Sequence, residues 1–223
     1  MKIAIVGATG LVGREIIRLC EELLPQEANY TLFASSNSAG TKLKVNEKDC
    51  EVKELKEENI ETYDISLFSA GGERSKKFAK NFVDKGSYVV DNSSAFRMEE
   101  EVPLVVYGIN EDKISKETKL ISNPNCTTMG LVMVLKPLHE KYKLEKIVPI
   151  SYQAVSGSGS AAVDSLKNEE KLGGDLKPNY KDGFYTRPIS KNVIPLAGNL
   201  TENGYSDEEM KFVNESRKIL DIK

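Results

Sequence analysis

A glycine-rich turn directly after the first apolar segment constrains the fold more than any other feature of the sequence. Residues 2–6 read KIAIV, a short run rich in β-branched side chains that is typical of a buried parallel strand. Gly7, Gly10 and Gly13 follow, and a helical pattern extends from about Leu11 to Leu24. A strand, a G-x-x-G-x-x-G turn and a helix in this order predict a dinucleotide-binding fold, in which a pyrophosphate rests on the helix N-terminus.

The rest of residues 1–126 alternates between predicted strands and helices. Strands are predicted at residues 30–34, 65–70, 88–91 and 119–121, a helix at 73–84, and an exposed hairpin at 42–54. This alternation predicts an α/β fold with a doubly wound, parallel, Rossmann-type sheet. Ligands bind beyond the carboxyl ends of such strands. The residues that fall there are Gly7, Ser35, Gly71, Arg97 and Cys126.

Residues 127–223 have a different pattern and are predicted to form a second domain of α+β type. A strand is predicted at residues 146–154 and a shorter one at 189–195, with a helix at 161–172. A charged amphipathic helix is predicted at residues 206–220, with Ser206 as its N-cap. The predicted organisation is therefore a dinucleotide-binding domain in residues 1–126 followed by a second domain in residues 127–223.

The segment after the second predicted strand bears on the choice of nucleotide. Proteins of this fold that select NAD place an acidic residue there, where it binds the ribose 2′-hydroxyl. This chain has Ser35, Ser36, Asn37 and Ser38 instead, and no carboxylate that would repel a 2′-phosphate. The segment favours NADP as the cofactor; the alternative interpretation is an ordinary polar loop.

Cys126 is the candidate nucleophile. The strand at residues 119–121 must end before Pro124, and apolar positions beyond Cys126 recur at helical spacing to about Tyr142. A cysteine at a helix N-terminus has its thiolate form stabilised. The adjacent N–H groups, with the Asn125 amide, are placed to hold the oxyanion formed when a thiolate attacks a carbonyl. The alternative is that Cys126 is a small buried apolar residue, as many unpaired cysteines are.

Composition excludes several classes of protein. The 223 residues carry 31 Lys and Arg against 34 Asp and Glu, and this balance does not favour binding to nucleic acid or to a membrane surface. The apolar runs are too short to span a bilayer, and the strand at the N-terminus leaves no room for a signal peptide. Three separated cysteines and one histidine, His139, show no metal-ligand spacing, so we expect no metal site and a cytoplasmic location.

Four further motifs follow the glycine turn in order along the chain. They are Ser69-Ala70-Gly71-Gly72, the DNSSAFR sequence at 91–97, the SNPNCTT sequence at 122–128 and the QAVSG sequence at 153–157. With these motifs the chain resembles the aspartate-semialdehyde dehydrogenase family over nearly its whole length. The resemblance implies NADPH-dependent interconversion of aspartyl phosphate and aspartate 4-semialdehyde through a thioester on Cys126. Such enzymes serve lysine, threonine and methionine biosynthesis.

The resemblance also implies roles for individual residues. Arg97 and Lys211 would bind phosphate, Glu208 the substrate amino group, and Gln153 would orient the acyl group. The residues implied to hold the cofactor are Thr9, Gly10, Leu11, Val12, Asn37, Ser38, Ser156 and Gly157. Without the resemblance, Glu208 and Lys211 are more simply interpreted as a solvated ion pair on one helix face.

The chain departs from the family pattern in two places. Tyr107-Gly108-Ile109-Asn110 stands where the family has Pro-Glu-Val-Asn. The family also continues well beyond Lys223, with an arginine for the substrate carboxylate and a histidine that acts as general acid and base. His139 lies too far along its helix from Cys126 to replace that histidine. We therefore expect a partial substrate-binding and dimerisation domain, weak or no activity for the chain alone, and a homodimer.

Two other functions stay open. N-acyl-glutamyl-phosphate reductases share the layout but have Asn-Pro-Gly-Cys, so Asn125 argues against that substrate. A dinucleotide-binding module without catalytic activity is the second alternative.

Overall fold

The computed structural model describes residues 1–173 and 182–222, which form two compact units. The first unit comprises Met1–Lys146 together with the C-terminal residues from Phe212 onward, and the second comprises Ile147–Lys211. The domain boundary expected at residue 126 falls inside the first unit, and it stays a prediction.

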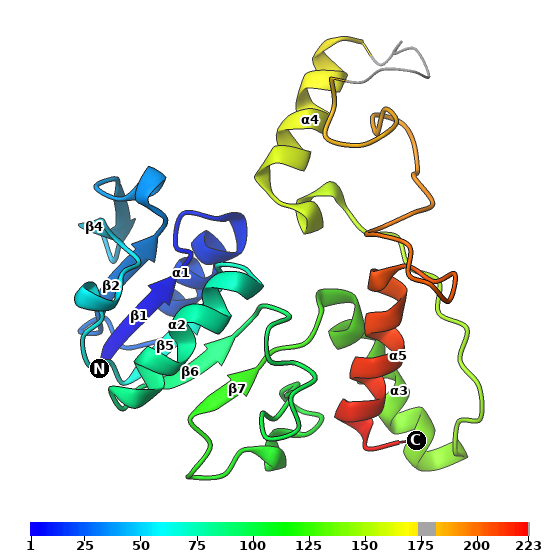
Figure 1. The fold of residues 1–223 in the computed structure, drawn as a ribbon, viewed down its shortest axis with the longest axis horizontal. Coiled ribbons are helices and arrows are strands. Elements are labelled where there is room, and N and C mark those ends of the chain that lie inside the picture. The colour runs from blue at the N-terminus through cyan, green and yellow to red at the C-terminus, as the bar shows by residue number, and fades with distance from the viewer. Residues whose placement is uncertain (174–181, 223) are drawn as a thin grey trace. The chain divides into compact units, whose positions relative to one another are not determined.

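A mostly parallel sheet of seven strands forms the centre of the first unit (Figure 1). Its strands are β1 (Lys2–Val6), β2 (Asn29–Ala34), β3 (Lys42–Val45), β4 (Lys48–Glu54), β5 (Ile65–Phe68), β6 (Tyr88–Asp91) and β7 (Leu120–Ser122). Their order in the sheet is β3-β4-β2-β1-β5-β6-β7, and only the β3–β4 hairpin pairs antiparallel. The chain thus runs outward from β1 in one direction and then in the other. The predicted doubly wound, Rossmann-type α/β fold is confirmed.

Helices α1 (Leu11–Leu23) and α2 (Gly72–Asp84) pack against opposite faces of this sheet. Side chains alternate between the two faces along a strand. Ala4 and Val6 therefore pack with α2, whereas Ile3 and Ile5 pack with α1. Both faces are covered, which is why β1 has an almost continuous apolar sequence.

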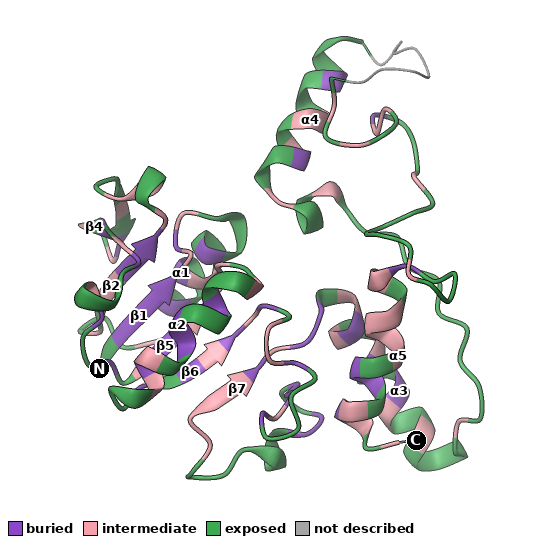
Figure 2. Ribbon diagram, viewed as in Figure 1, coloured by how far each residue is buried: buried purple, intermediate pink, exposed green. Residues whose placement is uncertain are grey.

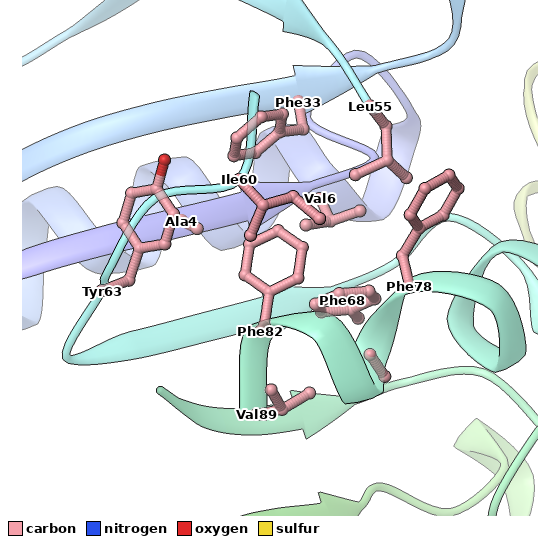
Figure 3. Packing of buried hydrophobic residues seen from close by; sticks show 11 residues of the cluster. Ala4, Val6, Phe33, Leu55, Ile60, Tyr63, Phe68, Phe78, Phe82 and Val89 are labelled. Atoms are coloured by element: carbon pink, nitrogen blue, oxygen red, sulfur yellow. The ribbon is translucent and has the colours of Figure 1, made fainter. Parts of the chain in front are cut away.

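Aromatic rings fill the core between the sheet and α2 (Figure 3). The ring of Phe82 on α2 lies 5.1 Å from that of Phe68 and 5.8 Å from that of Phe33, both edge to face. Such pairs each contribute about 0.5–1.5 kcal/mol beyond the area that they bury. Figure 2 shows the buried residues concentrated along β1, β2 and the inner faces of the helices.

The turn between β1 and α1 has no room for side chains at two of its glycines. A Cβ on Gly13 would lie 2.1 Å from the carbonyl oxygen of Gly7. A Cβ on Gly7 would lie 2.3 Å from the carbonyl oxygen of Ser69, and Gly7 has a φ of +91°, which disfavours other residues. The glycines therefore allow α1 to start directly against the end of β1.

In the described part of the chain, the other α-helices are α3 (Cys126–Tyr142), α4 (Ser160–Lys171) and α5 (Asp207–Leu220). The predicted N-cap of α5 is confirmed by a reciprocal pair of hydrogen bonds. Ser206 Oγ accepts the N–H of Glu209 at 3.1 Å, and Glu209 Oε2 accepts the N–H of Ser206 at 2.6 Å. This capping box satisfies two donors that a helix start would otherwise leave unpaired. The second half of α5 belongs to the first unit.

The two strands predicted for the second unit are wrong, because residues 146–154 and 189–195 have no strand in the structure. The first segment does alternate, but Val148, Ile150 and Tyr152 are 74%, 83% and 82% exposed. An extended segment becomes a strand only by pairing with a neighbour, and the described residues supply none here. In the second segment, the N–H groups of Ile189 and Ser190 bind the carboxylate of Glu169 instead, at 2.7 and 2.8 Å.

We expect Gly13→Ala to destabilise the protein by about 1–3 kcal/mol or more, because the new methyl group meets backbone atoms that cannot move independently. Gly130→Ala is the matched control, since Gly130 lies within α3 and a Cβ there would meet nothing within 4 Å. That change should stabilise the helix by up to about 1 kcal/mol. Urea unfolding measures both, and equal stabilities of the two variants would contradict the predicted close packing of α1 on β1.

Candidate functional site

The ends of five parallel strands place the predicted site residues along one edge of the sheet. The strand register aligns Val6 with Phe33 and with Phe68, Phe68 with Asp91, and Asp91 with Ser122. The segments that follow these residues carry the glycine turn, the serine-rich segment, Gly71, the polar loop and the turn before α3. The structure thus brings the candidate cofactor and nucleophile segments of the first unit to the same edge (Figure 1).

The start of α1 has the features of an anion-binding site. Its N-cap is Gly10, which has no side chain to bond the first-turn N–H groups, and the first turn contains no acidic residue. The side chains of Leu11 and Val12 are exposed, and Thr9 accepts a bond from Arg14 Nε only through its carbonyl. Backbone N–H groups at a helix N-terminus favour a bound pyrophosphate. With no room at Gly7 and Gly13 for side chains, the turn fits a dinucleotide.

The serine-rich segment lies at the end of β2, the neighbour of β1. Ser35 is the N-cap of a short 3-10 helix, Ser36–Ser38, and its carbonyl accepts the N–H of Ser38 at 2.9 Å. Ser36 and Asn37 are exposed. The side chains presented here are hydroxyls and an amide, which suit a ribose or its 2′-phosphate. On the other side of β1, Gly71 with a φ of +85° precedes α2.

Cys126 is the first residue of α3 and is exposed. Asn125 is the N-cap: its Oδ1 accepts the N–H of Thr127 at 3.0 Å and lies 4.0 Å from the sulfur of Cys126. The predicted helix from Cys126 to Tyr142 is therefore confirmed. The alternative interpretation of Cys126 as a small buried apolar residue is wrong, because the residue is exposed at a helix N-terminus.

A buried ion pair holds the turn before α3. Arg97 and Glu215 are only 7% and 2% exposed, and Arg97 Nη1 lies 3.0 Å from Glu215 Oε1. Arg97 also donates from Nε to the carbonyl of Asn123 at 2.9 Å and from Nη2 to the carbonyl of Asn92 at 3.0 Å. The second oxygen of Glu215 accepts the N–H of Asn125 at 2.7 Å. The phosphate-binding role that the resemblance implies for Arg97 stays a prediction; the contacts seen here position the turn.

A second polar network supports this turn from the sheet. The carboxylate of Asp91, fully buried, accepts bonds from the hydroxyls of Ser75 and Ser93, both at 2.6 Å. The carbonyl of Asp91 accepts the N–H of Asn123 at 2.8 Å, and the Asn123 amide donates to Asn92 Oδ1 at 2.6 Å. The loop after β6 and the turn after β7 are thus bonded to each other as well as to Arg97.

Lys218 adds a third anchor, one turn beyond Glu215 on α5. Its ammonium donates to three carbonyl oxygens, those of Arg97, Glu99 and Val102, at 2.9, 2.5 and 2.9 Å. Burial lowers the pKa of Lys218, although the neighbouring carboxylates of Glu99 and Glu100 oppose this effect. The end of α5 therefore fixes the loop that carries Arg97.

The other predicted site residues lie in the second unit. Gln153 and Ser156 are exposed, and a Cβ on Gly157 would lie 2.1 Å from Gln153 Nε2, so the Gln153 side chain lies against Gly157. Glu208 and Lys211, both half-buried, form an ion pair on α5. The structure thus brings Gln153 together with Gly157, and Glu208 together with Lys211. This ion pair is the contact expected from the simpler interpretation of Glu208 and Lys211, in which the two residues pair on one face of a helix.

Sequence reasoning missed Glu215. The available signal was its position: it lies seven residues after Glu208 and four before the buried Ile219, and therefore on the inner face of α5. An acidic residue on a buried helix face needs a cationic or N–H partner, but the sequence does not identify Arg97 as that partner.

Neither a metal site nor a membrane span is evident in the described part of the chain. Residues 1–173 and 182–222 contain no cluster of His, Cys, Asp and Glu side chains that could hold a metal ion. Within the same residues, no helix is long and apolar enough to cross a membrane.

Comparison with known proteins identifies the family of the chain. The family model for the semialdehyde dehydrogenase NAD binding domain matches residues 2–117, and that for the semialdehyde dehydrogenase dimerisation domain matches residues 135–223. The chain is 44% identical to the aspartate-semialdehyde dehydrogenase of Corynebacterium glutamicum, covering 99% of this chain and 69% of the relative. It is 39% identical to that of Bacillus subtilis, covering 99% of this chain and 65% of the relative.

Solved structures show the same likeness. Aspartate semialdehyde dehydrogenase II of Vibrio cholerae complexed with ASA matches with a TM-score of 0.91 at 34% identity, covering 99% of this chain and 66% of that one. The Candida albicans enzyme with NADP matches with a TM-score of 0.63 at 28% identity, covering 98% of this chain and 60% of that one. The chain therefore spans about two thirds of the length of these relatives.

The fold and the site define a two-part oxidoreductase of the semialdehyde dehydrogenase class, with a dinucleotide-binding sheet and a cysteine at a helix N-terminus. Within that class, the chain belongs to the aspartate-semialdehyde dehydrogenase family.

We expect Cys126 to react fastest of the three thiols. Burial raises the pKa of the Cys20 thiol, and burial together with the neighbouring Asp49 raises the pKa of the Cys50 thiol. Both thiols therefore form the reactive thiolate less readily than an ordinary cysteine, and Cys20 is also buried, whereas Cys126 is exposed at the start of α3. Mass spectrometry after brief alkylation with iodoacetamide measures the three rates. Faster labelling of Cys20 or Cys50 in the folded protein would exclude the nucleophile assignment.

Proposed function

We propose that this chain provides the dinucleotide-binding and nucleophilic part of a phosphorylating aspartate-semialdehyde dehydrogenase, which interconverts aspartyl phosphate and aspartate 4-semialdehyde. One observation carries the proposal: an exposed cysteine begins α3 at the same sheet edge as the turn that fits a dinucleotide. A cysteine elsewhere in a dinucleotide-binding protein could not reach a substrate that is also in contact with the bound cofactor.

The acyl-transfer step uses the residues around Cys126. Its thiolate attacks the carbonyl carbon of the acyl phosphate, and the negative charge passes to the carbonyl oxygen. The N–H groups of the first turn of α3 stabilise that oxyanion, because the helix start carries partial positive charge. When the oxyanion collapses, the carbon–oxygen bond to phosphate breaks and inorganic phosphate leaves. The product is an acyl thioester on Cys126.

The segments at the ends of β1 and β2 support NADP as the cofactor. The turn at Gly7–Val12 would hold the pyrophosphate, and Ser35–Ser38 the phosphorylated ribose. Gly71, Ser156 and Gly157 complete the set that we assign to cofactor binding. When bound, the nicotinamide supplies the hydride that reduces the thioester to the aldehyde.

Substrate recognition rests on charged and amide side chains. Lys211 and the remaining N–H donors of Arg97 suit the phosphate, since a guanidinium has five donors and the bonds seen here use three. Glu208 suits the substrate ammonium group, and Gln153 the acyl oxygen. Glu208 and Lys211 form an ion pair with each other, so each charge has a counter-ion on the same helix. We also propose that the protein forms a homodimer, because a dimerisation-domain model matches residues 135–223. We further propose a cytoplasmic location.

Acylation of Cys126 tests the proposed reaction without needing a complete catalytic cycle. Incubation with L-aspartyl phosphate should add one aspartyl group to Cys126, detected by mass spectrometry of the intact chain and its peptides. Cys126→Ala should remain unmodified, because Cys20 is buried and the pKa of the Cys50 thiol is raised. Preferential acylation by an N-acyl-glutamyl phosphate would favour the reductase alternative. No adduct with either acyl phosphate would favour a dinucleotide-binding module without catalytic activity.

We expect the chain to bind NADPH more tightly than NADH, and Ser35→Asp to reverse that preference. An aspartate at the end of β2 would repel the 2′-phosphate and accept bonds from an unmodified ribose. Aspartate is also a good N-cap, so the 3-10 helix that begins after Ser35 should persist. Fluorescence titration should show about a tenfold or greater loss of NADPH affinity and little loss for NADH. Equal affinities in the unmodified chain would contradict the role of this segment.

A further inference from the structure

The start of α3 must place four backbone N–H groups that have no partner within the helix. They belong to Asn125, Cys126, Thr127 and Thr128. The carboxylate of Glu215 accepts the N–H of Asn125 at 2.7 Å, and the Asn125 side chain accepts that of Thr127 at 3.0 Å. Glu215 thus supplies from α5 a contact that the local sequence does not provide.

The same carboxylate fixes the opposite side of the turn through Arg97. Its Oε1 lies 3.0 Å from Arg97 Nη1, while Arg97 Nε bonds the carbonyl of Asn123 at 2.9 Å. Glu215 and Arg97 together therefore bond the residues on both sides of Pro124. Because Pro124 has no N–H, this turn cannot be held by a bond from its own central residue.

We propose that Glu215 is a positioning residue for Cys126. Its carboxylate bridges Arg97 and the Asn125 N–H. This contact fixes the orientation of the first turn of α3, so that its N–H groups and the Cys126 thiol face the carbonyl group of one substrate. The inference rests on the proposed function, since it gives Glu215 a role in acyl transfer to Cys126. It adds that the geometry of the nucleophile is set from the C-terminal helix, by a residue that does not touch the substrate.

Two reactions of Cys126 separate its position from its ionisation. Alkylation by iodoacetamide forms a carbon–sulfur bond as iodide leaves, and it requires only an accessible thiolate. Acetylation by p-nitrophenyl acetate passes through a tetrahedral oxyanion before p-nitrophenolate leaves, so it also requires the positioned N–H donors. Both rates scale with the fraction of thiolate. Their ratio at one pH therefore reports the positioning of the oxyanion donors and not the ionisation of the thiol.

The decisive variant is Glu215→Gln in the full 223-residue chain. The carboxamide keeps one acceptor oxygen but presents an NH₂ group to either Arg97 or the Asn125 N–H, so one contact is lost in each orientation. Outright removal of one oxyanion donor typically costs about 10²–10³ in rate. Glu215→Gln displaces the donors and does not remove one, so we expect a smaller effect, with the ratio of acetylation to alkylation at Cys126 falling by about tenfold. Glu209→Gln is the matched control: it lies on the same helix, and its amide oxygen can still accept the Ser206 N–H.

Labelling of Cys20 monitors the fold in the same samples, because this thiol is buried on the inner face of α1. If Glu215→Gln exposes Cys20, Arg97→Lys is measured instead. It keeps a cation opposite Glu215 but lacks the planar group that reaches two carbonyls, and the same fall is expected. If both variants expose Cys20, the pair serves the stability of the whole unit and the proposal is overturned.

The outcomes also separate this inference from the proposed function. If Cys126 of the unmodified chain is acetylated no faster than Cys50, the nucleophile assignment fails. If Cys126 is acetylated rapidly and Glu215→Gln leaves the ratio within about twofold of the unmodified value while Cys20 stays protected, only the positioning role is overturned.

Discussion

The buried ion pair between Arg97 and Glu215 is the interaction on which the candidate site depends. Its two residues are 118 positions apart, and it ties α5 to the loop after β6 and to the turn after β7. A buried pair gains little net stability, because desolvation of the two charges offsets their attraction. Removing one partner is different: it leaves an uncompensated charge and costs about 3–5 kcal/mol. The pair therefore acts chiefly by fixing one arrangement.

The surrounding bonds make that arrangement possible. Arg97 directs two further N–H groups at carbonyl oxygens, and the second oxygen of Glu215 accepts a backbone N–H. The pair is thus embedded in a network in which each charged group has neutral partners as well as its counter-ion. Lys218 holds the same loop through three more carbonyls. Helix α5 consequently stabilises a site whose turn, at Asn125, lies ninety residues earlier in the chain than Glu215.

The parts of the fold that the sequence predicts correctly are those that depend on neighbouring residues. The turn after β1 follows from glycines that backbone contacts require, and the start of α3 follows from Pro124 and the apolar spacing beyond Cys126. The capping box of α5 is likewise local, spanning Ser206 to Glu209. Each of these elements is determined within one or two helical turns, so pattern and spacing suffice.

The parts that sequence reasoning missed depend on partners far away along the chain. Alternation at residues 146–154 predicts a strand, but a strand also needs a neighbour, which alternation cannot supply. Arg97 shows the same limit: its motif indicates a functional arginine, but only the structure shows that Glu215 is its counter-ion. The roles of Gln153, Glu208 and Lys211 came from the family resemblance, because their local pattern favours a surface helix and loop.

One face of α5 carries both residues with local partners and residues with partners far away along the chain. Glu208, Lys211, Glu215 and Ile219 recur at spacings that place them along a single stripe of the helix. The side chains of Glu208 and Lys211 are 26% and 28% exposed, whereas that of Glu215 is 3% exposed and Ile219 is buried in the core. The stripe thus passes from a solvent-accessible ion pair, through a buried carboxylate, to an apolar anchor. Because a helix is nearly rigid over three turns, the anchoring of Ile219 and Lys218 determines where Glu215 meets the turn before Cys126.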